Sequence, residues 1–154
     1  MMAIVGVALQ VRQANRARKH EFEDIYVQRY WQIMDALSAE DRIALVRGEM
    51  PASAQAHSET RSRLWSYLEL CEDEADQREA GLITTVTWHQ WRRGIHGAAT
   101  RPPYQSILDG FENELTMLPE SERPFMQLRR AATDADAAQY DPRKKKPIRD
   151  WFTG

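Results

Sequence analysis

Apolar side chains recur at helical spacing along most of the chain, and the segment 20–37 carries two such stripes where most amphipathic helices carry one. The first stripe consists of Phe22, Tyr26, Tyr30, Ile33 and Leu37. The second, on another side of the helix, consists of Val27, Trp31 and Met34. A helix that is apolar on two sides needs two neighbours. We expect other helices of the same chain to cover both stripes; the alternative is that a second subunit or a partner binds through Trp31.

Capping signals divide the first half of the chain into successive helices. No Pro or Gly interrupts the pattern between Val7 and Leu37, so one helix of about thirty residues is predicted there. Ser38 is an N-cap signal for a short helix that Gly48 ends, and a loop is predicted over residues 50–57. Ser58 opens a second long helix that ends near Gly81 and whose apolar face consists of Leu64, Leu68, Cys71, Ala75 and Leu82.

An aromatic helix follows. Thr87 and Gln90 form a capping-box pair at its start, and Trp88 and Trp91 lie three residues apart on its apolar face.

Two further helices complete the pattern. A proline pair precedes a helix that begins at Tyr104, and a last helix is predicted over residues 124–138. No strand pattern of convincing length occurs. We therefore predict an all-α fold, a helical bundle of four to five main helices with a long N-terminal helix.

Charge is segregated along the chain, although the net charge is only −2. Residues 1–20 hold four basic side chains and no acidic one, and residues 141–154 hold five basic against two acidic. The remaining 12 basic and 21 acidic side chains give residues 21–140 a net charge of −9. We divide the chain accordingly into an apolar and basic helix start (1–20), a helical bundle domain (21–140) and a basic extended tail (141–154). The acidic domain argues against nucleic acid as a partner.

The run Met1–Val11 is the one strongly apolar stretch. As a helix it spans only ~15 Å of a ~30 Å hydrocarbon core, and its basic residues follow the apolar run, which does not fit a secretory signal. It is similar to the last half of a membrane helix that ends at a cytosolic basic flank. The alternative interpretation is a helix end whose apolar residues pack locally.

Few side chains are candidates for a catalytic or metal-binding role. Cys71 has no partner cysteine and is interpreted as a small core residue. His89 and His96 have no acidic or Cys neighbour at ligand spacing, so neither a metal site nor a cofactor is predicted. Glu72 lies beside the apolar stripe of its helix, where a half-buried carboxylate needs a cation, and Arg29 is the candidate. The acidic residues around Glu72 are interpreted as solvated surface.

A resemblance to a known group of proteins rests on three elements: the segments Tyr67–Leu70 and Ala80–Ile83, and the aromatic helix that begins near Trp88. With these elements, residues 5–120 resemble small uncharacterised bacterial proteins in which one N-terminal membrane helix runs into a cytosolic helical bundle. The resemblance implies a membrane-anchored bundle of unassigned activity.

The leading functional hypothesis is a non-enzymatic helical interaction module in the cytoplasm, at or near the inner face of a bacterial membrane. Its candidate partners are a membrane protein, an anionic lipid surface or a second copy of the chain. The partner surface is predicted to comprise Val27, Trp31, Met34, Trp88 and Trp91. Contacts with lipid or other anions are predicted for Arg143, Lys144, Lys145, Lys146 and Arg149.

The alternative hypothesis is a small-molecule-binding or enzymatic bundle with an aromatic-lined pocket near Trp88 and Trp91. It receives less weight because no nucleophile, base and orienting residue form a recognisable set.

Overall fold

The structure, a computed structural model, describes residues 2–114, 118–119, 123–134, 137–138 and 140–143. Within these residues the chain forms seven α-helices and no strand, which confirms the all-α prediction, whereas the finer count of four to five main helices is not confirmed. The helices are α1 (Met2–Asp35), α2 (Ala39–Arg47), α3 (Ala52–Ala56), α4 (Ser58–Glu79), α5 (Thr85–Thr100), α6 (Tyr104–Glu114) and α7 (Met126–Thr133).

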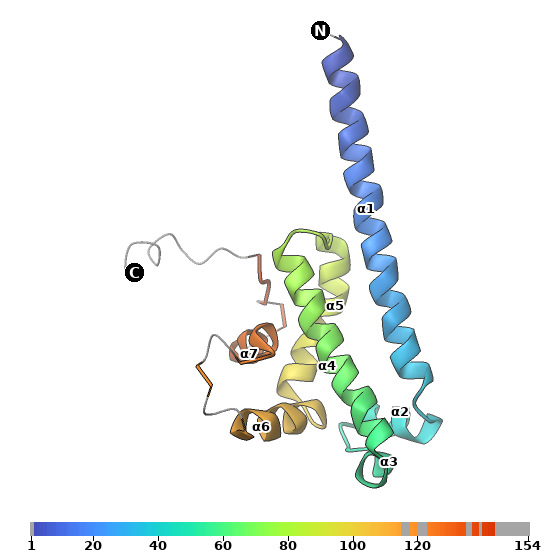
Figure 1. The fold of residues 1–154 in the computed structure, drawn as a ribbon, viewed down its shortest axis with the longest axis vertical. Helices are drawn as coiled ribbons and strands as arrows, with labels where there is room; N and C mark the ends of the chain where they lie inside the picture. The colour runs from blue at the N-terminus through green and yellow to red at the C-terminus, as the bar shows by residue number, and fades with distance from the viewer. Residues whose placement is uncertain (1, 115–117, 120–122, 135–136, 139, 144–154) are drawn as a thin grey trace.

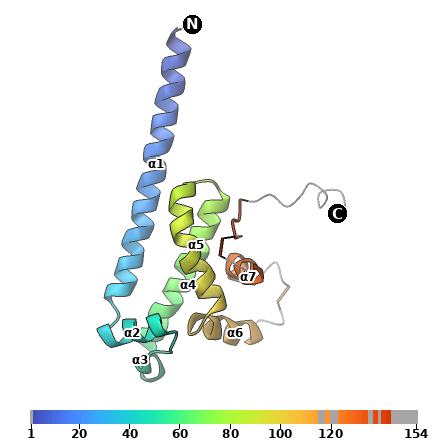
Figure 2. The same ribbon diagram turned by 180° about the vertical axis from the view of Figure 1, so that it is seen from behind.

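Helix α4 lies at the centre of the arrangement. Helix α1 runs along one side of it, α5 returns beside it, and α7 packs against α4 and α5 on the side away from α1 (Figures 1 and 2). The short helices α2 and α3 close one end of the bundle. The N-terminal half of α1 extends beyond the other helices, so only its C-terminal half meets the rest of the described chain (Figure 1).

The main core forms where α4, α5 and α7 meet. Leu68 and Ala75 of α4, Ile95 of α5 and Leu128 of α7 are all buried in it, as is the indole of Trp88. Cys71 is buried in the same cluster, as predicted for a small core residue. A second, smaller cluster joins α1 to α4 and contains Tyr26, Ile33 and Leu70.

Local capping signals place several helix ends correctly. The Ser38 side chain accepts a hydrogen bond from the backbone N–H of Asp41, and Gly48 ends α2 with φ 74°, a left-handed conformation that glycine adopts without strain. The cap of α5 is a correction: the Thr84 side chain accepts from the N–H of Thr87, so the N-cap lies three residues before the predicted one.

Two other predicted boundaries also change. Residues 52–56, predicted as loop, form the short helix α3, and α7 is shorter than the predicted helix over 124–138.

The predicted pairing of Glu72 with Arg29 is wrong. Arg29 Nη1 donates to Asp73 Oδ2 at 3.0 Å, whereas Glu72 accepts from the backbone N–H groups of Gln127 and Leu128 at 2.8 and 2.9 Å. These two N–H groups lie in the first turn of α7, where the N-cap residue, Phe125, supplies no side-chain acceptor. Glu72 therefore caps α7 from α4, and Asp73, one position further round α4, faces α1.

An ion pair of Arg78 links the end of the described chain to α4. The Arg78 side chain is buried, and its Nη2 donates to Asp141 Oδ2 at 2.8 Å while its Nη1 donates to the carbonyl of Ile83 at 3.0 Å. The Trp88 Nε1 donates to the carbonyl of Tyr140 at 3.2 Å. Residues 140 and 141 are thus held against α4 and α5 by one buried and two partly buried hydrogen bonds.

Candidate functional site

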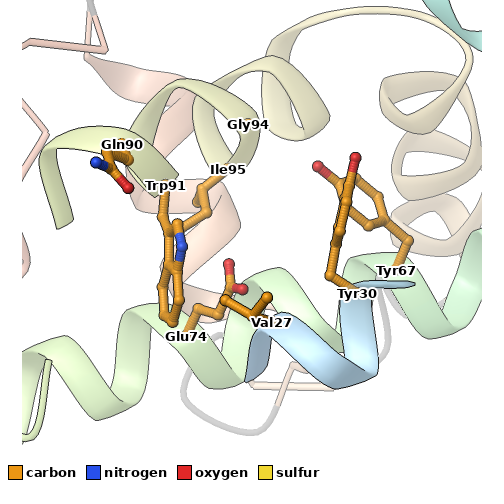
Figure 3. A pocket seen from close by; sticks show the side chains of 8 residues that line it. All are labelled: Val27, Tyr30, Tyr67, Glu74, Gln90, Trp91, Gly94 and Ile95. Atoms are coloured by element: carbon orange, nitrogen blue, oxygen red, sulfur yellow. The ribbon is translucent and has the colours of Figure 1, made fainter. Parts of the chain in front are cut away.

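A pocket of about 240 Å³ opens between α1, α4 and α5. Its walls come from all three helices: α1 on one side, α5 on the other and α4 at the base (Figure 3). The lining residues are Val27, Tyr30, Tyr67, Glu74, Gln90, Trp91, Gly94 and Ile95.

Glu74 supplies the acidic group of this pocket. The residue is 8% exposed, and neither carboxylate oxygen has a hydrogen-bond or ion-pair partner among the described residues. Every fully enclosed side-chain nitrogen or oxygen in the described part of the chain has a hydrogen-bond partner, so the Glu74 oxygens are reached from the pocket (Figure 3). Burial raises the pKa of Glu74 to about 8, although the positive charge of Arg29 acts in the opposite direction.

Aromatic rings form the walls on either side of Glu74. Trp91 stands on the α5 side and Tyr30 and Tyr67 on the other, with the carboxylate between them (Figure 3). The Tyr30 and Tyr67 rings are 6.2 Å apart between centroids, and Trp91 packs on Tyr26 at 6.0 Å. These contacts pack each ring against a second aromatic ring.

Gly94 allows α5 to approach Tyr67 closely. A Cβ atom at position 94 would lie 3.2 Å from Tyr67 Oη, tighter than ordinary van der Waals contact. The glycine therefore brings the tyrosine hydroxyl against the backbone of α5.

Two further hollows meet the pocket at Tyr67. One, of about 450 Å³, lies between α2 and α5 and is lined by Arg47, Arg93 and Arg101 together with Tyr104. The other, of about 340 Å³, lies between α1 and α2. Its lining residues are Tyr30, Trp31, Met34, Arg42, Leu45, Val46, Tyr67 and Tyr104. We call these two hollows together the Tyr67 groove. Its lining includes four arginines and no Asp or Glu.

The chain's own helices cover the second stripe of α1 only in part, so the prediction that they cover it is wrong. Trp31 is 56% exposed, Val27 is exposed, and Met34 is half-buried. Trp31 contacts the ring of Tyr30, its neighbour on the same helix, at 5.3 Å between centroids. Trp31 stays open because α4 packs against the side of α1 that carries Tyr26 and Ile33, with Met34 at the edge of that contact.

The structure separates the two tryptophans that the sequence placed in one site. Trp91 lines the pocket, whereas Trp88 is fully buried in the core and belongs to no surface, which corrects its assignment to the partner surface. Arg143 is exposed at the end of the described chain, near Gly81. Lys144, Lys145, Lys146 and Arg149 lie outside the described residues.

The two histidines considered as metal ligands, His89 and His96, lie outside the pocket. His96 Nε2 lies 3.0 Å from the carbonyl oxygen of Asp134, and His89 is exposed. Across the described ranges, no group of three or more His, Cys, Asp or Glu side chains is placed to hold a metal ion.

Sequence reasoning missed Glu74 because it treated α4 as having one apolar face. Tyr67, Leu70 and Glu74 follow one another at spacings of three and four, so they form a second stripe on the helix. Leu70 is completely buried against α1, and the same packing encloses Glu74. The Tyr67–Leu70 spacing is the signal that identifies this face.

Fold and site together define a helical bundle with an aromatic pocket over a buried carboxylate. No protein-family model, curated protein or solved structure matches the chain. No helix in the described residues is long and apolar enough to cross a membrane. The resemblance to bacterial proteins with an N-terminal membrane helix is therefore wrong.

Proposed function

We propose that this chain is a non-enzymatic helical interaction module that binds an acidic amphipathic segment of a partner protein in the Tyr67 groove. The main support is the combination of exposed apolar side chains with unpaired arginines along one groove. The finer architecture belongs to the same proposal: α1, α4, α5, α6 and α7 are the main helices, and the long α1 forms one wall.

The apolar part of the groove comes from α1 and α2. Trp31 is half exposed at its edge, and Val46 of α2 is 89% exposed beside it. Tyr67 and Tyr104, whose rings lie 4.7 Å apart between centroids, form the floor. Such a row of apolar side chains fits the apolar face of a helical segment, and partly exposed tryptophans contribute most to interfaces of this kind.

The positive charge of the groove favours an acidic partner. Arg47, Arg93 and Arg101 have no side-chain hydrogen bond or ion pair within the described part of the chain. Residues 21–140 carry a net charge of −9, so most of the domain repels an acidic chain while these arginines attract one. An acidic segment therefore binds best where the arginines gather.

A membrane location stays a prediction. It rests on the basic tail, whose residues 144–154 lie outside the described part of the chain.

The test is a selection from a displayed library of random peptides long enough for several helical turns. We expect the enriched sequences to combine Leu, Phe or Trp at helical spacing with Asp or Glu. The Kd of a selected peptide, measured by fluorescence anisotropy, should rise about tenfold or more in Trp31→Ala. In the double variant Arg93→Gln/Arg101→Gln, binding should weaken and become less sensitive to salt.

Val86→Ser is the matched control, because Val86 is also an exposed apolar residue but lies outside the groove. It should bind the peptide like the unmodified protein. Since Trp31 is exposed, Trp31→Ala should lower the free energy of unfolding by less than about 1 kcal/mol. A loss of peptide binding in this variant would therefore not result from unfolding. Selected peptides without acidic residues, or unchanged binding by Trp31→Ala, would contradict the proposal. So would a wild-type dimer that Trp31→Ala converts to monomer, because the occupant would then be a second copy.

A further inference from the structure

The pocket between α1, α4 and α5 presents an acidic group that the fold itself leaves unpaired. Glu74 is enclosed by α1 and α5, and its carboxylate oxygens have no hydrogen-bond or ion-pair partner in the described chain. An isolated buried carboxylate costs free energy unless something binds it. The carboxylate is directed into the pocket (Figure 3), so the position of the missing partner is the pocket itself.

The charged groups around Glu74 do not neutralise the charge of its carboxylate. From α1 the nearest cation is Arg29, but its guanidinium is bonded to Asp73 of α4 at 3.0 Å and lies over the Tyr26 ring at 5.6 Å from the centroid. From α4, Asp73 adds a negative charge. Tyr67 and Cys71 are uncharged at neutral pH, because the neighbouring Cys71 and burial raise the pKa of Tyr67, and burial raises the pKa of Cys71. The pocket residues that α5 supplies, Gln90, Trp91, Gly94 and Ile95, carry no charge.

Three aromatic rings line the pocket together with uncharged residues of α1 and α5. Trp91 and Tyr30 stand on opposite sides of the carboxylate, and Tyr67 lies beside Tyr30 (Figure 3). Aromatic faces attract cations through their quadrupole, most strongly when water is excluded, and they do so without needing hydrogen-bond donors from the ligand. A carboxylate among aromatic rings therefore suits a cation whose charge is covered by methyl groups.

We propose that this pocket binds a small organic cation of the quaternary ammonium class, held between Trp91 and Tyr30 with its charge against Glu74. This site is distinct from the groove proposed for a protein partner, because neither Glu74 nor Trp91 lines that groove. The two proposals can therefore fail separately.

Binding of such a cation is linked to a proton. With the pKa of Glu74 at about 8 in the empty pocket, the group is mostly neutral at pH 7. A bound cation favours the ionised form, so it lowers the pKa of Glu74 and releases a proton. Affinity should rise with pH by up to about tenfold per unit below the pKa and level off above it.

The experiment is titration calorimetry with choline and with its neutral carbon analogue, 3,3-dimethyl-1-butanol. Both ligands have nearly the same shape, so the difference between them reports the charge. At a pH of about 9, we expect choline to bind at least about tenfold more tightly than the alcohol, and at a pH of about 6 the difference should largely disappear. Glu74→Gln should remove the preference for choline and leave binding of the alcohol unchanged.

Glu21→Gln is the matched control, because it is the same change at an exposed position of α1 outside the pocket. It should keep the preference for choline. In the unmodified protein, carboxyl-carbon NMR should show the pKa of Glu74 falling on addition of choline, a result that does not depend on the folding of a variant. Equal binding of choline and the alcohol, no choline binding at all, or an unchanged Glu74 pKa at saturating choline each overturns the proposal.

Discussion

Replacing Glu74 by Gln should stabilise the protein at neutral and alkaline pH. The pKa of Glu74 is raised by burial from its ordinary value of 4.5 to about 8. Between these two values the folded protein binds a proton that the unfolded chain has released, so unfolding becomes easier as the pH rises. Gln has nearly the shape of a protonated Glu and does not ionise, so the variant lacks this dependence.

The size of the effect follows from the two pKa values. Each pH unit between them changes the free energy of unfolding by at most about 1.4 kcal/mol. From pH 5 to pH 8 the unmodified protein should therefore lose about 3–4 kcal/mol relative to Glu74→Gln, an order-of-magnitude figure for a residue that is 8% exposed. This is a large share of the stability of an ordinary domain.

The assay is urea denaturation of both proteins, followed by circular dichroism, at several pH values from 5 to 8. The difference between the two curves isolates Glu74, because other groups that titrate in this range are present in both proteins. Glu21→Gln, an exposed substitution of the same kind, should follow the unmodified protein at every pH. Parallel stability curves for the unmodified protein and Glu74→Gln would show that Glu74 is ionised throughout and would refute the reasoning.

Three further results are expected. Glu72→Gln removes the charge that accepts two N–H groups of α7 and should lower the unfolding free energy in urea by about 1–2 kcal/mol, whereas an unchanged value would mean that water caps α7 equally well. Arg78→Met leaves Asp141 without its buried partner and should cost about 3–5 kcal/mol; adding Asp141→Asn should recover part of this loss, and no recovery would contradict the pairing. Replacing lysines 144–146 by Gln should weaken salt-sensitive binding to anionic vesicles by about 1 kcal/mol each, and binding indifferent to salt would exclude a lipid role for the tail.

Features that depend on a few neighbouring residues were predictable from the sequence. Ser38 caps a helix because its hydroxyl reaches an N–H three residues on, and Gly48 ends it because a left-handed residue is required there. The starts of α4 at Ser58 and of α6 at Tyr104 follow from equally local signals. The all-α class follows from helical spacing repeated along the chain.

Side-chain pairing was not predictable, because it depends on how each helix is rotated against its neighbours. Successive residues on a helix differ by about 100° in direction, and the sequence does not fix the rotation of α4 against α1 well enough to decide between Glu72 and Asp73 as the partner of Arg29. Likewise Trp88 and Trp91 share an apolar face in sequence, yet one points into the core and the other into the pocket. Spacing predicts which residues share a face but not which neighbour that face meets.

The exposure of Trp31 illustrates a different limit. Two apolar stripes on α1 show that two surfaces need cover, but the number of neighbours depends on how the remaining helices distribute themselves. Helix α4 packs on the first stripe and touches only Met34 of the second, α5 reaches α1 at the pocket beside Val27, and Trp31 is left exposed. The stripe that stays open lies beside the arginines of the Tyr67 groove, and this juxtaposition exists only in three dimensions.

The pocket and the groove share one wall, so binding at one site can affect binding at the other. Tyr30 and Tyr67 line both the pocket and the groove, so a cation that fixes these rings also fixes the surface that a partner meets. If one ligand favours the ring positions that the other needs, each increases the affinity for the other by the same factor, because the linkage is reciprocal. The shared rings therefore predict that choline and the acidic peptide change each other's Kd by the same factor.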